Sequence, residues 1–594
     1  MRTKKINAEH TMSVFVRSTY KQITMYKHIH LISTVLFLTI SSYAQEKDSI
    51  GTQIVNIVKP YTPTLSDAFK ILENPVLNDT VTPEKSPIAY SIFSVPVAST
   101  FVPTTGNALK RTLVDKETLY NTYLSLALGN YNTALLDFYT ARPLDKNTAL
   151  NIGLHHHSSQ GGISNVVLDD NFFNTGLQLA YAKKRRSSDW KAEAGFQHQR
   201  YNWYGIYDTD AFDQNTINSI EERQNYYDVY VSAAITQRDS YFKEGAITLR
   251  RFWDAFNSAE YRMAANPALA FPIAGERINT KISLDYLYGD FNRAYLDTAP
   301  IHYSSLLAGI NPSLVILRDH IKVTLGARMV YAFSPDTKAS DFFIYPHIDA
   351  SYNIIKNHLT AYGGLKGDLI QNTYRDFVAE NQFLSPTLTI TPTDKQYDAY
   401  LGFKGKFSGN LGYHVKGTYS VENNKPLFLL NPVTNMPDEA YSYGNSFGII
   451  YDDVKTFSFL GALDIDVYKN LNIDIRAEFF DYQTENEPEA WNLPAVRGTV
   501  AANYTIGKHW FGSTNIFYVG GRSDLLDIEG AIDPGIITAD SYVDINTQME
   551  YRFNNRLSAF VKLNNILNNE YARWATYPVQ GFQALAGVSY QFNF

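Results

Sequence analysis

Apolar and polar residues alternate along several segments of this chain, most clearly over residues 278–286, 321–331 and 471–479. In the second segment Ile321, Val323, Leu325, Ala327, Met329 and Tyr331 alternate with Lys322, Thr324, Gly326 and Arg328. Because successive side chains of a strand point to opposite faces, each segment predicts a β-strand with one apolar and one polar face. A soluble sandwich shows the same period, but its strands are usually shorter. A membrane barrel directs the apolar face to lipid and the polar face to its lumen.

The lengths of the connections favour the membrane barrel. Short polar turns are expected at 318–320, 356–358, 408–410, 469–470, 507–509 and 554–556, and longer loops at 204–223, 376–395, 423–453 and 522–540. Alternation of short and long connections is typical of periplasmic turns and extracellular loops. Reading from Leu119, we expect about 22 antiparallel strands with roughly eleven long loops and ten short turns. An even number of strands places both ends of the barrel in the periplasm.

Composition agrees with an all-β membrane protein and excludes several other classes. Aromatic residues make up 14% of the 594 residues, and there are 34 glycines. No apolar stretch in the body of the chain is long enough for a transmembrane helix. The net charge of −7 argues against a nucleic-acid partner. Absence of cysteine excludes disulfides and thiolate metal sites.

The N-terminal residues predict export. A short apolar run at 31–40 follows Lys27, and Ser42-Tyr43-Ala44 provides a small-x-small cleavage site before Gln45. We therefore expect a signal peptide over residues 1–44, with Met25 as the true start; a long translated leader is the alternative. Residues 45–116 carry seven prolines, which disfavour helices and central strands. This segment is expected to be extended, filling the lumen or binding a partner, and residues 117–594 are expected to form the barrel.

The last residues of the chain form an amphipathic strand. One face carries Phe582, Ala584, Ala586, Val588, Tyr590, Phe592 and the terminal Phe594. An apolar strand ending on an aromatic residue is similar to the signal that barrel assembly machinery reads. We expect Val588, Tyr590, Phe592 and Phe594 to serve as this signal.

The segment before that strand carries a family resemblance. Asn564-Asn565-Ile566-Leu567-Asn568-Asn569-Glu570-Tyr571, then Tyr577-Pro578 and Gly581, resembles the end of TonB-dependent receptors, except that Phe582 stands where the family often has Arg. The resemblance implies a barrel of about 22 strands in the bacterial outer membrane, transport across that membrane, and TonB as a partner.

The N-terminal region of this chain differs from that of TonB-dependent receptors. Family members fill the lumen with a plug of well over a hundred residues, for which the region before Leu119 leaves no room. A wide barrel cannot fill its lumen with side chains alone, so the Pro-rich segment, infolded loops or another polypeptide must occupy it. The extended run Ile54-Val55-Asn56-Ile57-Val58 is either a TonB-box-like strand or a strand that binds another periplasmic or lipoprotein partner.

Three groups of residues are candidate sites, each with a simpler interpretation. The aromatic residues Tyr201, Trp203, Tyr204 and Tyr207 are candidate ligand contacts, although an aromatic girdle is favoured. His155-His156-His157, with His198, could hold a metal, but consecutive strand residues point to alternate faces and polar rim residues are favoured. The acidic residues of the 522–540 loop lack the spacing of a calcium loop, which favours a solvated loop; they are Asp524, Asp527, Glu529, Asp533 and Asp540.

No motif of a catalytic, metal or phosphate-binding site stands in a plausible context, so we expect no enzyme, no cofactor and no bound metal. The leading functional hypothesis is substrate transport across the outer membrane. The alternative is a structural or assembly barrel that docks periplasmic or surface proteins through its N-terminal segment. Expected partners are outer-membrane lipid, the barrel assembly machinery and either TonB or a periplasmic protein or lipoprotein, with no nucleic acid.

Overall fold

A computed structural model describes residues 120–594 apart from 207–211, 274–275, 435–438 and 527–534. The chain divides into two units, Met1–Lys110 and Arg111–Phe594, and the second contains every described strand and helix. The expected signal peptide, the Pro-rich segment and the run Ile54–Val58 lie outside the described residues, as do Tyr207, Asp527, Glu529 and Asp533.

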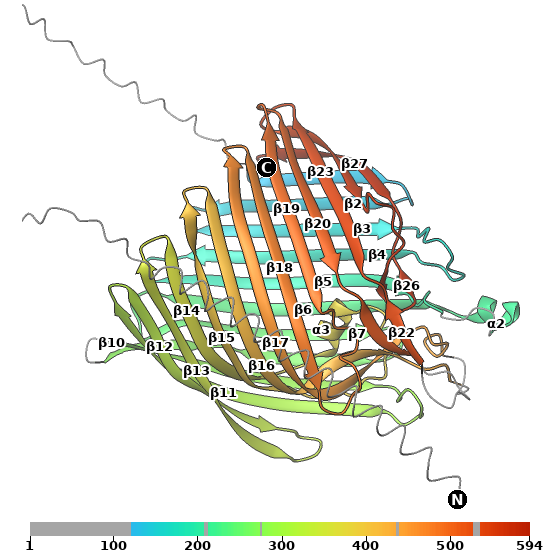
Figure 1. Ribbon diagram of the computed structural model, residues 1–594, viewed down its shortest axis with the longest axis horizontal. Coiled ribbons are helices and arrows are strands. Elements are labelled where there is room, and N and C mark those ends of the chain that lie inside the picture. Colours follow the sequence, from blue (N-terminus) through green and yellow to red (C-terminus); the bar gives the residue numbers. More distant parts are fainter. Residues whose placement is uncertain (1–119, 207–211, 274–275, 435–438, 527–534) are drawn as a thin grey trace, which may run out of the picture. The chain divides into compact units, whose positions relative to one another are not determined.

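The described chain forms one closed antiparallel barrel (Figure 1). Its strands are β1 (Thr122–Gly129), β2 (Ala134–Asp145), β3 (Thr148–Ser159), β4 (Phe172–Lys184), β5 (Ser188–Asn202), β6 (Arg223–Gln237), β7 (Phe242–Asp254), β8 (Ala259–Ala265), β9 (Ala268–Ile273), β10 (Glu276–Phe291), β11 (Ile301–Arg318), β12 (Ile321–Phe333), β13 (Ser340–Ile355), β14 (Leu359–Ile370), β15 (Thr393–Ser408), β16 (Leu411–Leu430), β17 (Phe447–Tyr468), β18 (Leu471–Thr484), β19 (Val496–Ile506), β20 (Trp510–Val519), β23 (Tyr542–Arg552), β24 (Leu557–Asn564) and β27 (Gln583–Phe592).

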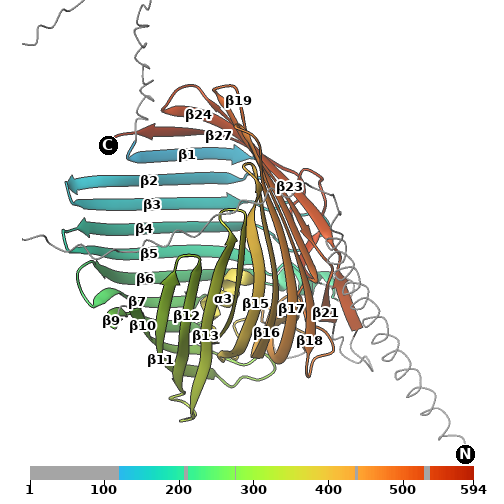
Figure 2. The same cartoon turned by 60° about the vertical axis from the view of Figure 1, so that its left-hand side comes forward.

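Closure comes from the pairing of the first and last strands, which lie side by side in Figure 2. Thr122 faces Phe592 and Gly129 faces Leu585 across this seam. Strands β8 and β9 both pair with β7 and with β10, so they are two halves of one strand interrupted at Asn266-Pro267. Proline has no N–H to donate to the ladder, which explains the interruption. The barrel therefore has 22 strands, as the sequence predicted.

The alternating segments are strands with the predicted faces. They correspond to β10, β12 and β18. On β12, Leu325 and Tyr331 are exposed on the outer surface, whereas Val330, on the opposite face, is fully buried. No described helix is long and apolar enough to cross a membrane.

Short turns and longer loops alternate over most of the barrel and define a turn end and a loop end, but two connections at the loop end, 130–133 and 255–258, are also short. Two of the short turns use a left-handed residue, Asn357 at φ 66° and Gly507 at φ 65°. The barrel begins and ends at the turn end. One prediction was wrong in extent: the loop expected at 423–453 spans only 431–446, because β16 and β17 remain paired from Lys425–Asp452 to Leu430–Phe447 beyond a register shift.

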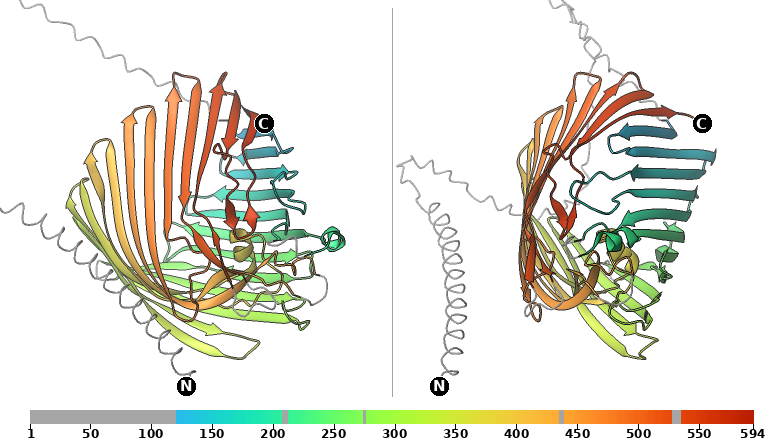
Figure 3. Two further views of the ribbon diagram at one scale, coloured as in Figure 1. Left: turned by 45° about the vertical axis from the view of Figure 1, so that its right-hand side comes forward. Right: turned by 90° about the vertical axis from the view of Figure 1, so that its right-hand side faces the viewer.

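The remaining elements lie in the long loops, which gather at one end of the barrel in Figure 3. They are the helices α2 (Gln214–Ser219) and α3 (Tyr374–Glu380), the hairpin of β21 (Arg522–Leu526) with β22 (Gly535–Ala539), and the small pair of β25 (Ala572–Trp574) with β26 (Tyr577–Pro578).

Candidate functional site: a loop folded into the lumen

Residues 371–392, which connect β14 to β15 and which we call the strap, lie inside the barrel at its loop end. Figures 1 and 2 show helix α3 of the strap within the ring of strands. The helix begins at Thr373, whose side chain accepts a hydrogen bond from the amide of Asp376 at 3.0 Å. Such an N-cap satisfies one of the free N–H groups of the first turn. The helix ends where Asn381 adopts an extended conformation.

The first turn of α3 rests on Glu260 of β8. Its carboxylate accepts hydrogen bonds from the amide of Tyr374 at 2.6 Å, the amide of Arg375 at 3.4 Å and the hydroxyl of Tyr303 at 2.9 Å. Glu260 is buried. A buried carboxylate is costly unless hydrogen bonds compensate for lost water, and here the free amides of the helix supply them.

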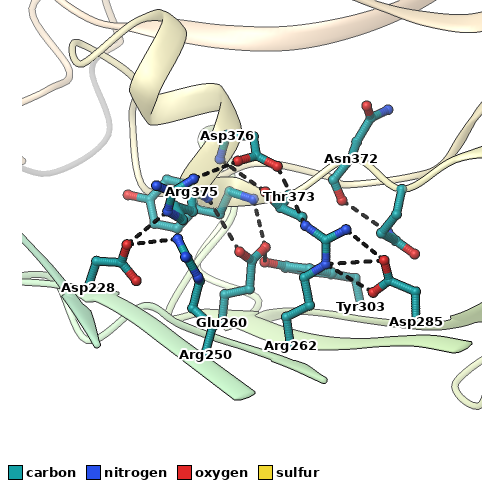
Figure 4. A network of polar contacts seen from close by, with 12 residues as sticks. Asp228, Arg250, Glu260, Arg262, Asp285, Tyr303, Asn372, Thr373, Arg375 and Asp376 are labelled. Atoms are coloured by element: carbon teal, nitrogen blue, oxygen red, sulfur yellow. Dashed lines mark hydrogen bonds and ion pairs between the residues drawn. The ribbon is translucent and has the colours of Figure 1, made fainter. Parts of the chain in front are cut away.

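Three arginines extend the polar contact between the strap and the wall (Figure 4). Arg375 of α3 donates through Nε to Asp228 of β6 at 2.8 Å, and Arg250 of β7 reaches the same carboxylate oxygen at 2.9 Å. Arg262 of β8 donates three hydrogen bonds to the carboxylate of Asp285 of β10. It also lies 3.7 Å from Asp376 of the strap. The strap is therefore held by charged groups on several neighbouring strands.

Tyr374 adds an apolar anchor with a polar end. Its ring is fully buried, and makes edge contacts with Phe252 and Phe291 at centroid distances of 5.1 and 5.0 Å. Its hydroxyl donates to Asp254 at 2.8 Å. Asp254 also accepts from the amide of Ser258 in the β7–β8 loop. One side chain thus couples the strap to the wall and to a neighbouring loop.

Beyond the strap, several long loops share an aromatic cluster that we call the loop core. Phe383 of the strap stacks on Tyr577 of β26 at 3.7 Å, and Tyr204 of the β5–β6 loop meets Tyr577 at 4.9 Å. Leu384 and Phe447 are fully buried in it. The chain thus brings residues from the β5–β6 loop, the strap, the β16–β17 loop and the β24–β27 loop together over the loop end of the lumen.

A cavity of about 610 Å³ is lined by strands β1 to β6 of the wall and by Arg375 of the strap. Its lining includes Asp137, His155, Gln197, Asp228 and Arg375, which are polar groups on β2, β3, β5, β6 and α3. Phe138, Leu154, Leu177 and Phe196 line it as well, so the cavity combines apolar surface with groups that can bond water or a polar solute.

The aromatic residues singled out in the sequence lie at the edge of this assembly. Trp203 is buried and contacts the rings of Phe256 and Tyr441 at 5.3 and 5.4 Å. Tyr204 is buried as well, and its hydroxyl donates to the carbonyl of Pro578 at 2.9 Å; burial raises its pKa well above the usual value. Tyr201 is half-buried and stacks on Phe172. In this conformation these rings contact protein, so their role as ligand contacts stays a prediction.

The histidine run alternates between faces, as strand geometry requires. His155 Nδ1 lies 2.6 Å from Asp137, and His156 Nδ1 lies 2.7 Å from Thr175 on the opposite face. His198 stacks on Tyr227. Among the described residues, no group of three or more His, Cys, Asp or Glu is placed to hold a metal.

Asp524 of the acidic 522–540 loop is part of the packed interior and bonds to two neighbouring segments. It is fully buried and accepts from the amide of Leu430 at 2.9 Å and from the Asn492 side chain at 2.7 Å. Burial raises its pKa to about 6. Asp540 is exposed. The strand Val588–Phe592 has the predicted faces, since Val588, Tyr590 and the following Phe594 are exposed outward.

Sequence reasoning missed the residues that hold the strap. Glu260, Arg375 and Asp228 are each ordinary polar residues of a lumen wall or a long loop, and nothing in their spacing links them. The only usable signal was the length of the loop itself, because long loops with helical segments tend to have a function.

No family model and no curated protein matches this chain. Solved structures with a similar fold include the pyoverdine outer membrane receptor FpvA from Pseudomonas aeruginosa (11% identity, 80% of this chain and 79% of that chain, TM-score 0.57). The ferric enterobactin receptor PfeA is similar at 12% identity (80% and 82%, TM-score 0.58). The FrpB iron transporter from Neisseria meningitidis is similar at 9% identity (81% and 82%, TM-score 0.61).

These likenesses define the class of the fold. The chain is a transmembrane barrel of the outer-membrane type, with the architecture of the TonB-dependent receptors that its C-terminal segment resembles. At such low identity the likeness concerns the fold alone.

Proposed function

We propose that this protein is an outer-membrane transport barrel whose passage is controlled at the loop end by the strap and the loop core. We propose that the loop end faces the cell exterior and that the first and last residues of the barrel face the periplasm. A lumen as wide as that of a 22-strand barrel cannot be filled by wall side chains. Loops that fold into the lumen, such as the strap, block part of it.

The observation that carries this proposal is the chemistry of the strap's attachment. Arg375, Glu260 and Asp228 hold the strap through charge-assisted hydrogen bonds to a polar wall. Such bonds can be exchanged for bonds to water when the strap leaves, because both partners are well hydrated once separated. The neighbouring cavity, which Arg375 lines together with Asp137 and Gln197, already provides space for water or solute. A strap attached only by an apolar core would have no comparable way to open.

The test is the conductance of purified barrels in a planar bilayer. We expect small or rare openings for the full chain and large, steady openings when residues 374–390 are replaced by a Gly-Ser linker. A matched control shortens the β12–β13 loop (334–339), which adds no residue to the loop core, and is expected to behave like the full chain. If the strap deletion conducts no more than the full chain, the proposal is wrong.

A docking barrel is the second candidate, and the loop core favours it. Leu384, Phe447 and Tyr577 are at most 1% exposed, which describes a packed core more than a readily opened lid. On this view residues 45–116, including Ile54–Val58, bind TonB or another periplasmic or lipoprotein partner. Stable partners recovered with the full chain and lost on deletion of 45–116, together with a silent strap deletion, would favour docking.

The remaining expectations accompany either function. We propose that the apolar outer wall contacts outer-membrane lipid, that Val588, Tyr590, Phe592 and Phe594 are read by the barrel assembly machinery, and that the barrel catalyses no reaction.

A further inference from the structure

The outer surface of the barrel carries a continuous row of rings with an arginine at each end. The row crosses β4 to β7 near the loop end and consists of Arg200, Phe173, His198, Tyr227, Trp253 and Arg251; we call it the arginine-capped row. Successive rings lie 4.6, 4.5 and 5.2 Å apart. The guanidinium of Arg200 lies 4.8 Å from the Phe173 ring centroid, and that of Arg251 lies 4.8 Å from Trp253.

The strand register places this row on the lipid-facing side. Arg251 faces Val229, and Tyr227 faces Trp253, so these side chains share a face. The next residues on this face are Val231, two positions after Val229, and Leu249, two positions before Arg251. Both are exposed apolar residues of the outer wall. The lumen-facing residues of the same strands, such as Asp228, are the ones that contact the strap.

The arginines of the row lack anionic partners within the described part of the chain. Neither Arg200 nor Arg251 forms an ion pair there, and the buried Nε of Arg200 has no hydrogen-bond acceptor. Arg251 is exposed and is held between the rings of Trp253 and Tyr261, the latter at 5.3 Å. A buried donor without an acceptor costs free energy, and an arginine on the lipid face is unfavourable away from the interface.

An apolar groove begins beside Arg251 and follows the wall away from the row. Its volume is about 340 Å³. The outward side chains that line it are Val229, Val231, Leu249, Tyr261, Met263 and Tyr286. A groove of this composition on the lipid-facing wall suits a hydrocarbon chain.

The height of the row along the barrel fits a lipid head group. Arg251 is three residues from Asp254, the end of β7 on the loop side. At about 3.3 Å per residue and a tilt near 45°, the Cα of Arg251 lies roughly 7 Å inside the end of the strand. The aromatic girdle of a membrane barrel lies at this level, where head groups meet hydrocarbon.

We propose that the arginine-capped row and its groove bind a lipid with phosphate groups on its head, from the leaflet at the loop end. Arg251 and Arg200 contact phosphate oxygens, the rings between them carry the head group, and one acyl chain lies in the groove. Phosphate fits because guanidinium groups form paired, charge-assisted hydrogen bonds with it. This proposal needs only the membrane-embedded barrel and does not depend on transport.

Native mass spectrometry of the full chain in detergent, titrated with diphosphoryl lipid A, tests the site. We expect one retained lipid on the unmodified chain and about tenfold weaker retention for Arg251→Gln and for Arg200→Gln. The unmodified chain should retain lipid A that lacks both phosphates no better than the double variant, Arg200→Gln with Arg251→Gln, retains diphosphoryl lipid A. The control is Lys404→Gln, which removes a cation that also lies over an aromatic ring, Tyr362, but on the lumen face; its retention should be unchanged.

The proposal is overturned if the double variant, Arg200→Gln with Arg251→Gln, retains diphosphoryl lipid as well as the unmodified chain does, or if the dephosphorylated lipid is retained equally. Heat-modified migration on gels shows that each variant is a folded barrel. In case Arg200→Gln fails to fold, Arg251→Gln alone decides the outcome, because Arg251 is exposed and its removal leaves no buried group unpaired. Bilayer conductance is a separate measurement, so failure here and failure of the transport proposal are distinguishable.

Discussion

Arg375 donates a hydrogen bond of 2.8 Å to Asp228, which stands 147 residues earlier in the chain. The bond joins a helix inside the lumen to the barrel wall. Arg250 donates to the same oxygen, so Asp228 has two cationic partners and remains paired when one is removed. This arrangement allows the attachment of the strap to be weakened without leaving a buried charge alone.

The first prediction uses that arrangement. Arg375→Ala should loosen the strap while the barrel remains folded, because Asp228 keeps Arg250 as a partner and Glu260 keeps the amide of Tyr374. We expect a loss of about 1–3 kcal/mol in the local stability of α3, measured as faster amide exchange over residues 374–380. More frequent openings in a planar bilayer should accompany it. Arg476→Ala, which removes a lumen arginine paired with Glu478, is the control and should leave α3 unchanged.

The second prediction uses two substitutions of Tyr374 to distinguish the polar from the apolar contribution to the attachment of the strap. Tyr374→Phe removes only the hydrogen bond to Asp254 and should cost the strap about 1–2 kcal/mol. Tyr374→Ala also removes a fully buried ring and should cost about 3–5 kcal/mol. Exchange protection of α3 in the two variants gives both values. Equal effects would show that the ring contributes little and that the packing described for Phe252 and Phe291 does not hold the strap.

The third prediction concerns pH. Asp524 has a folded pKa of about 6, above the value of 3.8 for an unfolded aspartate, because burial disfavours its charge. The folded loop around Asp524 therefore holds the proton more tightly than the open form, and the stability of that loop falls as pH rises through the interval between these two values. Between pH 5 and pH 7.5 the loss should be about 1 kcal/mol. Amide exchange of Leu430, corrected for the intrinsic pH dependence, should report it.

Asp524→Asn provides the comparison for that measurement, since an amide cannot titrate. The pH dependence of Leu430 exchange should flatten in this variant. A dependence that persists unchanged would assign it to another group.

A fourth prediction tests the two faces of the wall with neighbouring residues of β12. Leu325→Arg places a charge on the lipid-facing side and should destabilise the barrel by about 2–4 kcal/mol. Thr324→Arg places the same charge in the lumen and should change stability by less than about 1 kcal/mol. Urea unfolding from lipid vesicles measures both. Equal effects would contradict the assignment of these faces.

The strands could be predicted from the sequence because they depend on the local alternation of apolar and polar residues and on turn residues. Asn357 and Gly507, for instance, mark turns where the chain needs a positive φ. The strap was not readable, since its contacts join Glu260 to Tyr374 across 114 residues and Arg375 to Asp228 across 147. Trp203 and Tyr204 illustrate the same limit: an aromatic run can form a girdle, a ligand surface or a core, and only the long-range partners Tyr441 and Tyr577 decide.

The last prediction concerns the C-terminal strand, where the structure and the expected assembly role can be separated. Phe594 lies beyond β27, which ends at Phe592, and 79% of its surface is exposed. Its side chain therefore contributes little to the folded barrel, and deleting it should leave the stability of barrels refolded in detergent within about 0.5 kcal/mol of the full chain. If assembly machinery reads this residue, the same deletion should strongly reduce the amount of heat-modifiable barrel recovered from cell membranes. Ser589→Ala, on the lumen face of the same strand, is the control for expression and should assemble normally. Equal recovery of the deletion and the full chain from membranes would refute the role of Phe594 as an assembly signal.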